Sequence, residues 1–289
     1  MSAVLEKDRV VERVVNSQEA PVGTFTVRRA LPDRQRHSVG PWVFLDHFGP
    51  FRVQPGQDGV GAHPHAGIET VTYLLSGRQE HRDSAGHTGI VSAGGAQWMT
   101  AGRGIVHAES SLAETEEERT AHGIQLWTSL PRALKLMEPR YQRIDAASIP
   151  TTVSEGVRVR TIGGTLDGDT GPAQVLMPLV LAHVSLDAGA RFEAAVDAGF
   201  ELAAYVLEGS GRFGPEKVAA SVGELVLFSA GDRVSIANDS PGAVELMLLG
   251  GAPAEGPLVF HGPFVMNNVE QVRAAEIDYR TGRMGTIKS

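Results

Sequence analysis

Short apolar runs separated by turn residues recur along the chain, and they predict β-strands. Residues 25–27 alternate between apolar and polar positions, residues 42–45 are continuously apolar, and residues 70–75 and 123–127 are rich in β-branched, aromatic and aliphatic side chains. Runs of this length are typical of strands, because amphipathic helices need a longer stretch with a 3.6-residue period. The best helix candidate is residues 269–277, with apolar positions at Val269, Val272, Ala275 and Ile277. The pattern predicts an all-β fold with a short C-terminal helix.

The second half of the chain carries a diverged copy of the first. Residues 69–77 match residues 201–209 at an offset of 132, and residues 101–104 have a looser match in residues 230–233. Two homologous β domains explain both matches. A connector at residues 131–139 follows the last strand of the first copy, and a chain of 289 residues can bury two cores. We therefore place the boundary near residue 138, between a metal-binding domain (1–137) and a second domain without metal ligands (138–289).

Composition excludes several classes of function. The formal net charge is −8 and the chain has no Lys/Arg-rich run, so it lacks the electrostatic footprint of a nucleic-acid-binding protein. It has no cysteine, which excludes disulfides, thiolate metal sites and a cysteine nucleophile. The charged N-terminus and the absence of a long apolar run predict a cytoplasmic protein with no membrane partner, and we expect a monomer. The acidic run 114–119 is interpreted as a solvated loop.

Two pairs of potential metal ligands have the spacing of residues on one face of a strand. His63 and His65 form a His-x-His pair, and His107 and Glu109 repeat the i, i+2 spacing on a second segment. If both segments face the interior of one small barrel, three imidazoles and one carboxylate meet at a single ion. This ligand set suits Fe, Ni, Cu, Mn or Zn, and ligand identity alone does not separate them. An ion that prefers six ligands would keep two positions open for water, dioxygen or substrate.

The sequence around these ligands resembles the first motif of the cupin superfamily, which here comprises Gly59, His63, His65, Glu69 and Gly77. Within the cupins, residues 44–50, 63–75, 97–109 and 261–267 are similar to the pirin family. The resemblance implies two tandem cupin barrels, each a double-stranded β-helix. It also implies one divalent metal, iron(II) first among the candidates, on His63, His65, His107 and Glu109. Two positions depart from the family pattern, because Ala66 and Gly95 stand where pirins commonly have Arg and Asp.

Glu69 is the rival of Glu109 for the carboxylate ligand, because many other cupins use this position of the first motif. At the offset of 132, His63 and His65 become Ala195 and Asp197, whereas Glu69 is matched by Glu201. A glutamate that is kept where the histidines are lost suggests a supporting role. We therefore expect Glu69 beside the metal site and not as a ligand.

The other candidate residues are given structural roles. A polar turn is expected to hold His81 and His87, and core packing to hold Trp42, Trp98 and Met99. The histidines without a partner at ligand spacing, His37, His122, His183 and His261, are treated as structural, whereas Asp46 and His47 are open to a capping, hydrogen-bonding or chemical role.

Two functions from different classes follow from the resemblance. The first is a metal-dependent dioxygenase that cleaves flavonols such as quercetin, with Glu109 able to accept the hydroxyl proton of the small aromatic substrate. The second is a regulatory protein in which the oxidation state of the metal changes affinity for a protein partner, a metabolic enzyme or a transcription factor. Without cysteines, only the metal could sense redox state. The same ligands serve both functions.

Overall fold

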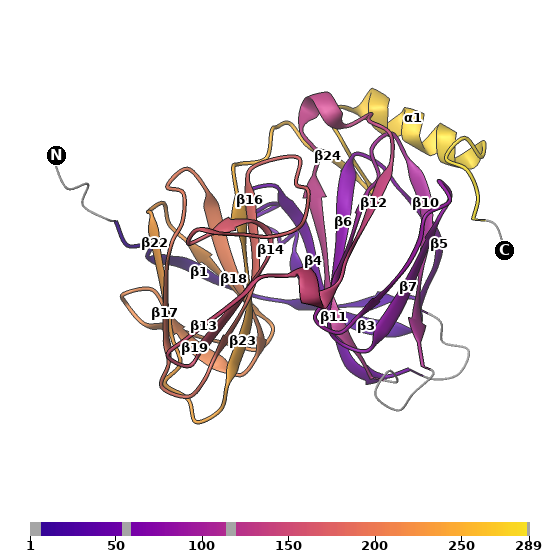
Figure 1. Ribbon diagram of the computed structural model, residues 1–289. Helices are drawn as coiled ribbons and strands as arrows, with labels where there is room; N and C mark the ends of the chain where they lie inside the picture. Colours follow the sequence, from indigo (N-terminus) through magenta and orange to yellow (C-terminus); the bar gives the residue numbers. More distant parts are fainter. Residues whose placement is uncertain (1–6, 54–58, 114–119, 288–289) are drawn as a thin grey trace. The chain divides into compact units, whose positions relative to one another are not determined.

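The computed structural model describes residues 7–53, 59–113 and 120–287, and within them the chain forms two β-barrel units and one α-helix (Figure 1). This confirms the predicted all-β architecture. The acidic run 114–119 lies outside the described residues.

The first unit contains the predicted metal ligands and is built from two sheets. The larger has the order β12-β9-β6-β11-β4-β3-β2 and the smaller the order β5-β10-β7-β8. The strands of the larger sheet are β12 (Arg140–Ile144), β9 (Ala96–Thr100), β6 (Ile68–Ser76), β11 (Thr120–Ser129), β4 (Trp42–Arg52), β3 (Phe25–Leu31) and β2 (Gln18–Val22). Those of the smaller are β5 (Gly59–His65), β10 (Ile105–Leu112), β7 (Arg78–Asp83) and β8 (Thr88–Ser92). Two 3-10 turns, Arg132–Leu134 and Ala146–Ser148, flank β12.

The second unit repeats this strand order. Its larger sheet runs β1-β21-β18-β23-β16-β14-β13, with β15 on β14, and its smaller sheet runs β17-β22-β19-β20. The strands of the larger sheet are β1 (Val11–Asn16), β21 (Glu224–Phe228), β18 (Glu201–Glu208), β23 (Val244–Gly251), β16 (Leu179–Leu186), β14 (Val157–Leu166), β13 (Thr151–Ser154) and β15 (Asp169–Thr170). Those of the smaller are β17 (Arg191–Ala195), β22 (Arg233–Ala237), β19 (Ser210–Phe213) and β20 (Val218–Ser221). Strands β6 and β18, which carry the sequence repeat, occupy the same place in their sheets.

The compact units do not follow a single boundary near residue 138. The described residues of 1–18 and 30–42 belong to one unit with 149–253, and those of 19–29 and 254–289 belong to the other with 43–148. The N-terminal strand β1 pairs with β21, more than two hundred residues away, as the indigo ribbon beside the orange strands shows (Figure 1). Backbone pairing requires an open sheet edge and does not depend on sequence separation.

The C-terminal segment packs on the metal-binding unit. It consists of the hairpin of β24 (Val259–His261) and β25 (Phe264–Met266) followed by α1 (Val269–Arg280), which extends the predicted helix by three residues. The Asn268 side chain caps α1 by accepting a hydrogen bond from the Gln271 backbone N–H. A cluster of buried side chains joins this segment to the strands that carry the histidines: Ala66, Val106, Phe264, Met266, Val272, Ala275 and Met284.

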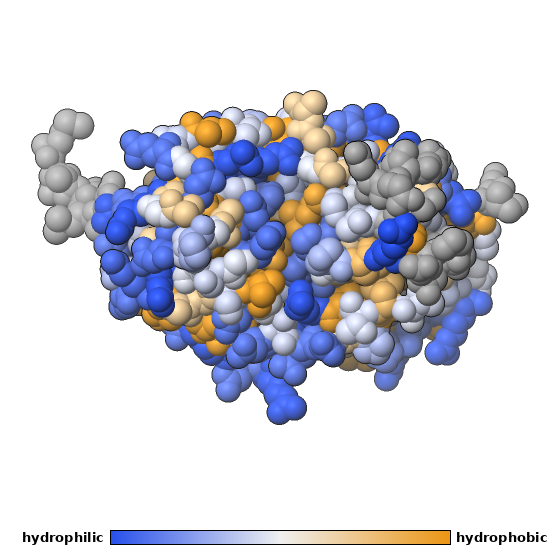
Figure 2. Space-filling view, turned by 90° about the horizontal axis from the view of Figure 1, so that it is seen from below, coloured by the Kyte–Doolittle hydropathy of each residue, from blue (hydrophilic) through white to orange (hydrophobic). Residues whose placement is uncertain are grey.

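Hydrophilic residues and smaller hydrophobic patches alternate over the face seen in Figure 2. None of the helices in the described part of the chain is long and apolar enough to cross a membrane.

Candidate metal centre

The fold brings the two predicted ligand pairs together on adjacent antiparallel strands. In the register of β5 and β10, His63 lies opposite His107, and His65 lies opposite Ile105. Between His107 and Glu109 the register shifts, so that β5 contains one extra residue, and such bulges redirect side chains near functional sites. The ring centroids of the three histidines are 4.3–5.0 Å apart. One nitrogen from each of the three lies within 4.8 Å of the others, so this set could hold a divalent metal ion.

Hydrogen bonds orient two of these rings with one nitrogen free. His63 Nδ1 lies 2.8 Å from the Gly61 carbonyl oxygen, and His65 Nδ1 lies 3.2 Å from the Pro263 carbonyl oxygen. A carbonyl can only accept, so each Nδ1 carries a proton, and in the neutral ring this arrangement leaves the lone pair on Nε2. Within the described residues, His65 Nε2 and both ring nitrogens of His107 are buried without a hydrogen-bond partner. Buried nitrogens of this kind are costly unless they bind something, and a metal ion fits them.

Burial also favours the neutral form of His65 and His107, which is the form that binds metal. It lowers the pKa of His65 to about 3, with repulsion from His63 as the next cause. Burial lowers the pKa of His107 well below its ordinary value, and the neighbouring histidines add to the effect.

Glu109 lies on β10 together with His107 but does not belong to the three-histidine set. It is 5% exposed, and three side chains donate to its carboxylate. Thr72 Oγ1 and Gln97 Nε2 lie 2.8 and 2.9 Å from Oε1, and Gln125 Nε2 lies 3.3 Å from Oε2. These donors come from β6, β9 and β11, and we call the face of the larger sheet that carries them its inner face. The expectation that Glu109 is the fourth ligand stays a prediction.

Glu69 lies on the opposite face of the same sheet, so the expectation that it supports the metal ligands is wrong. Thr100 Oγ1 donates to it at 2.7 Å and Thr128 Oγ1 at 3.2 Å, and the Arg140 guanidinium is 3.6 Å away. Glu69 is three residues from Thr72, and an odd separation puts two side chains of one strand on opposite faces. Burial raises the pKa of Glu69, against the opposing effect of these hydrogen bonds. Glu69 is therefore a structural carboxylate.

The error has a local cause in the backbone between the two strands. A single strand continuing from His63 to Glu69 would place both histidines and Glu69 on one face. In the structure β5 ends at His65 and β6 begins at Ile68, with Gly67 at a φ of +75° between them. The alternation of side chains restarts after that turn.

Two residues beside the histidines were not expected at the site. His81 lies on β7, not in a turn, and is 1% exposed, with its ring centroid 5.4 Å from that of His107. His81 Nε2 bonds to Asp83 at 3.0 Å, and Asp83 also bonds to His87. The Trp127 ring packs edge-on against His65 at 4.8 Å. The positions of His81 and Trp127 beside the histidines depend on which strands become neighbours, so no spacing in the sequence predicts them.

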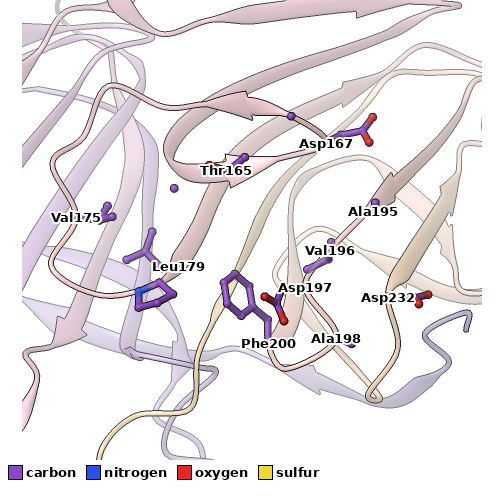
Figure 3. Close-up of a pocket in the computed structure, with 13 residues that line it drawn as sticks. Thr165, Asp167, Val175, Leu179, Ala195, Val196, Asp197, Ala198, Phe200 and Asp232 are labelled. Carbon is purple, nitrogen blue, oxygen red and sulfur yellow. The ribbon is translucent and has the colours of Figure 1, made fainter. Parts of the chain in front are cut away.

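The corresponding end of the second barrel holds a cavity of about 860 Å³ without a histidine (Figure 3). Ala195 and Asp197, the counterparts of His63 and His65, lie in its wall. Figure 3 shows Phe200 beside Asp197, with Asp167 and Asp232 farther along the wall. The three-histidine arrangement of the first barrel is not repeated among these lining residues.

Comparisons with known proteins agree with this architecture. Residues 24–128 match the model of the Pirin family, and residues 181–285 match that of the Pirin C-terminal cupin domain. The chain belongs to the pirin family. Pirin from Rattus norvegicus is 36% identical over 96% of this chain and 94% of its own, and Pirin from Homo sapiens is 35% identical over the same shares. A crystal structure of quercetin 2,3-dioxygenase from Acinetobacter baumannii superimposes with a TM-score of 0.89 at 30% identity, covering 97% of this chain and 99% of that one. As a pirin, the protein is a bicupin.

Proposed function

We propose that this pirin is a metal-dependent dioxygenase that acts on flavonols, with iron(II) in the first barrel on His63, His65, His107 and Glu109. The observation that carries the proposal is the set of buried imidazole nitrogens without partners, since they form a preorganised place for one ion. The similarity over nearly the full chain to a structure of quercetin 2,3-dioxygenase supports the substrate class.

An aromatic wall beside the histidines suits a flat ring system. Trp127 packs against His65, and Phe44 stacks on Trp127 with centroids 4.0 Å apart and planes at 11°. The Arg29 guanidinium lies 4.5 Å above Phe44 and forms two hydrogen bonds with Asp46. Offset stacking and cation–π contacts of this kind favour aromatic ligands over aliphatic ones.

In this chain Ala66 stands at the position where pirins commonly have an arginine, and Arg29 is a candidate for the same role. Ala66 is fully buried and bridges Phe264 in the C-terminal segment, so nothing charged occupies that position. Arg29, with one third of its side chain exposed, supplies a cation at the far end of the aromatic stack. Because Asp46 already balances its charge, we propose that Arg29 donates a hydrogen bond to a flavonol hydroxyl at the end away from the ion.

The chemistry divides between the ion and the chain. A bound ion would polarise the flavonol hydroxyl and offer open positions for substrate and dioxygen. Glu109 would accept the hydroxyl proton, and its three hydrogen-bond donors hold the carboxylate in one orientation on the inner face.

The test is oxygen uptake by protein loaded anaerobically with Fe(II) and then given quercetin and air. We expect dioxygen consumption together with bleaching of the flavonol over many turnovers per metal. The His65→Ala variant should lose both, whereas His183→Ala, which removes a histidine of the second barrel paired with Glu245, should keep both. Uptake equal to that of free Fe(II), or unchanged in His65→Ala, would contradict the proposal and favour the regulatory hypothesis.

A further inference from the structure

Lys135 is a buried cation whose partners join distant parts of the first barrel. It follows the short turn Arg132–Leu134 and is 0% exposed. Its ammonium donates to the Gly67 carbonyl at 2.8 Å, the Val265 carbonyl at 2.7 Å and Ser129 Oγ at 2.7 Å. Burying an ammonium is costly unless its donors are satisfied, and these three acceptors satisfy all of them.

The two carbonyls flank the contact that orients a metal ligand. His65 Nδ1 bonds to the Pro263 carbonyl at 3.2 Å. Each carbonyl bound by Lys135 lies two residues further along one of these two segments, at Gly67 and at Val265. Between them, the Val265 backbone N–H donates to the Ala66 carbonyl at 3.1 Å. Lys135 therefore holds together, from one side, the two chain segments that meet at His65.

We propose that Lys135 is a positioning residue of the metal centre. By tying Gly67 to Val265 it keeps the Pro263 carbonyl on His65 Nδ1, so that His65 presents Nε2 to the ion. The inference rests on the metal site of the proposed function and adds a residue, and the C-terminal segment, to its machinery.

The proposal has a consequence that a purely structural contact would lack. When a carbonyl accepts from Nδ1–H, one tautomer of the neutral ring is selected, and the lone pair stays on Nε2. If the Pro263 carbonyl moves away, the proton can sit on either nitrogen and the ring can turn. Loss of a partner that orients a metal-binding histidine typically weakens metal affinity by about 10- to 100-fold.

The contacts of Lys135 persist whether or not it is charged. Burial, with repulsion from Arg132 as the next cause, lowers the pKa of Lys135 to about 7. A neutral amine keeps two donors for the two carbonyls and can accept from the Ser129 hydroxyl instead.

The experiment compares Lys135→Met, which keeps an unbranched apolar side chain but removes the amine, with Arg132→Met as a matched control. Arg132 also bonds to the chain just before the C-terminal segment, at the Gly256 carbonyl, seven residues before Pro263. Three quantities are measured for each protein: the Ni(II) dissociation constant by chelator competition, the His65 tautomer by ¹⁵N NMR of the metal-free protein, and the free energy of unfolding in urea.

We expect Lys135→Met to raise the Ni(II) dissociation constant by about 10- to 100-fold and to abolish the single Nδ1–H tautomer of His65, with Arg132→Met unchanged in both. A lower free energy of unfolding with an unchanged dissociation constant and tautomer would overturn the proposal. If Lys135→Met does not fold, Ser129→Ala, which removes one of the three contacts, should show the same changes to a smaller degree, and no change would refute the inference. Failure of the wild-type protein to bind Ni(II) would count against the metal site itself, whereas the tautomer in metal-free protein would still decide the role of Lys135.

Discussion

The two buried glutamates of the first barrel should respond differently to the same substitution. Glu69→Gln and Glu109→Gln each replace a carboxylate by an amide of nearly equal size. Glu109 shares a strand and a face with His107, whereas Glu69 lies on the other face of the larger sheet. We expect both variants to be less stable and only Glu109→Gln to bind metal more weakly.

The stability cost follows from the hydrogen bonds. Thr100 and Thr128 donate to different oxygens of Glu69, and an amide offers only one acceptor. One hydrogen bond to a charged group is worth about 1.5–3 kcal/mol, so Glu69→Gln should cost up to about 2 kcal/mol once relief of the buried charge is subtracted. That relief is real because burial raises the pKa of Glu69. Glu109→Gln should cost a similar amount, since its three donors also face two oxygens.

Urea unfolding of the metal-free proteins measures the first quantity, and chelator competition with Ni(II) measures the second. The Ni(II) dissociation constant should be unchanged in Glu69→Gln and at least about tenfold higher in Glu109→Gln, since even partners of ligands contribute that much. Equal weakening in both variants would refute the assignment of faces. Weaker Ni(II) binding in Glu69→Gln alone would mean that Glu69 is the carboxylate ligand, as in many other cupins.

Three further predictions address ligands, pH and the second barrel. His63→Ala or His107→Ala should lose most of the bound metal by elemental analysis while keeping the circular dichroism of the fold, and full occupancy would exclude the site. Burial, followed by repulsion from His122, lowers the pKa of His47 to about 3. Between pH 3 and 6.5 the unfolded chain therefore binds more protons than the folded chain, and the free energy of unfolding falls as the pH drops through that window. Relative to His47→Gln, wild-type protein should lose about 1 kcal/mol between pH 7.5 and 5.5 in urea unfolding, and parallel curves would contradict this. Arg9→Met, which removes bonds to the carbonyls of three residues, should destabilise the second barrel by about 3 kcal/mol without changing metal affinity, and a changed affinity would argue against separate roles.

The sequence predicts the features that depend on the local spacing of side chains along a strand. The i, i+2 spacing of His63 with His65 and of His107 with Glu109 predicted two pairs on strand faces, and the structure brings the three histidines together. The repeat of residues 69–77 predicted a second barrel, and the two sheets have the same strand order. Alternation along a strand is a property of the backbone itself, which is why such patterns remain readable.

What could not be predicted depends on where alternation restarts and on which strands become neighbours. Glu69 does not share a face with the histidines because a turn at Gly67 separates β5 from β6. In the sequence, a glycine in such a turn cannot be told from a glycine inside a strand. His81 reaches the site only because β7 pairs with β10, with His81 opposite Glu109. The placement of the N-terminal strand in the unit of residues 149–253 likewise depends on the pairing of β1 with β21, for which the sequence carries no local signal.

The glutamate kept in both halves explains how one barrel could lose its ligands and remain folded. Glu201 occupies the place of Glu69 in β18, accepts from the Gly40 backbone N–H at 2.6 Å and pairs with Arg36 at 3.0 Å. Glu69 joins strands of its own sheet, and Glu201 joins β18 to the segment 36–40, so in both barrels this position makes structural contacts. The pair His63 and His65 and this sheet contact therefore lie on different residues, so having Ala195 and Asp197 in place of these two histidines removes metal ligands without removing the contacts of this glutamate. By the same reasoning, stability of the first barrel should depend more on Glu69 and Lys135 than on its histidines.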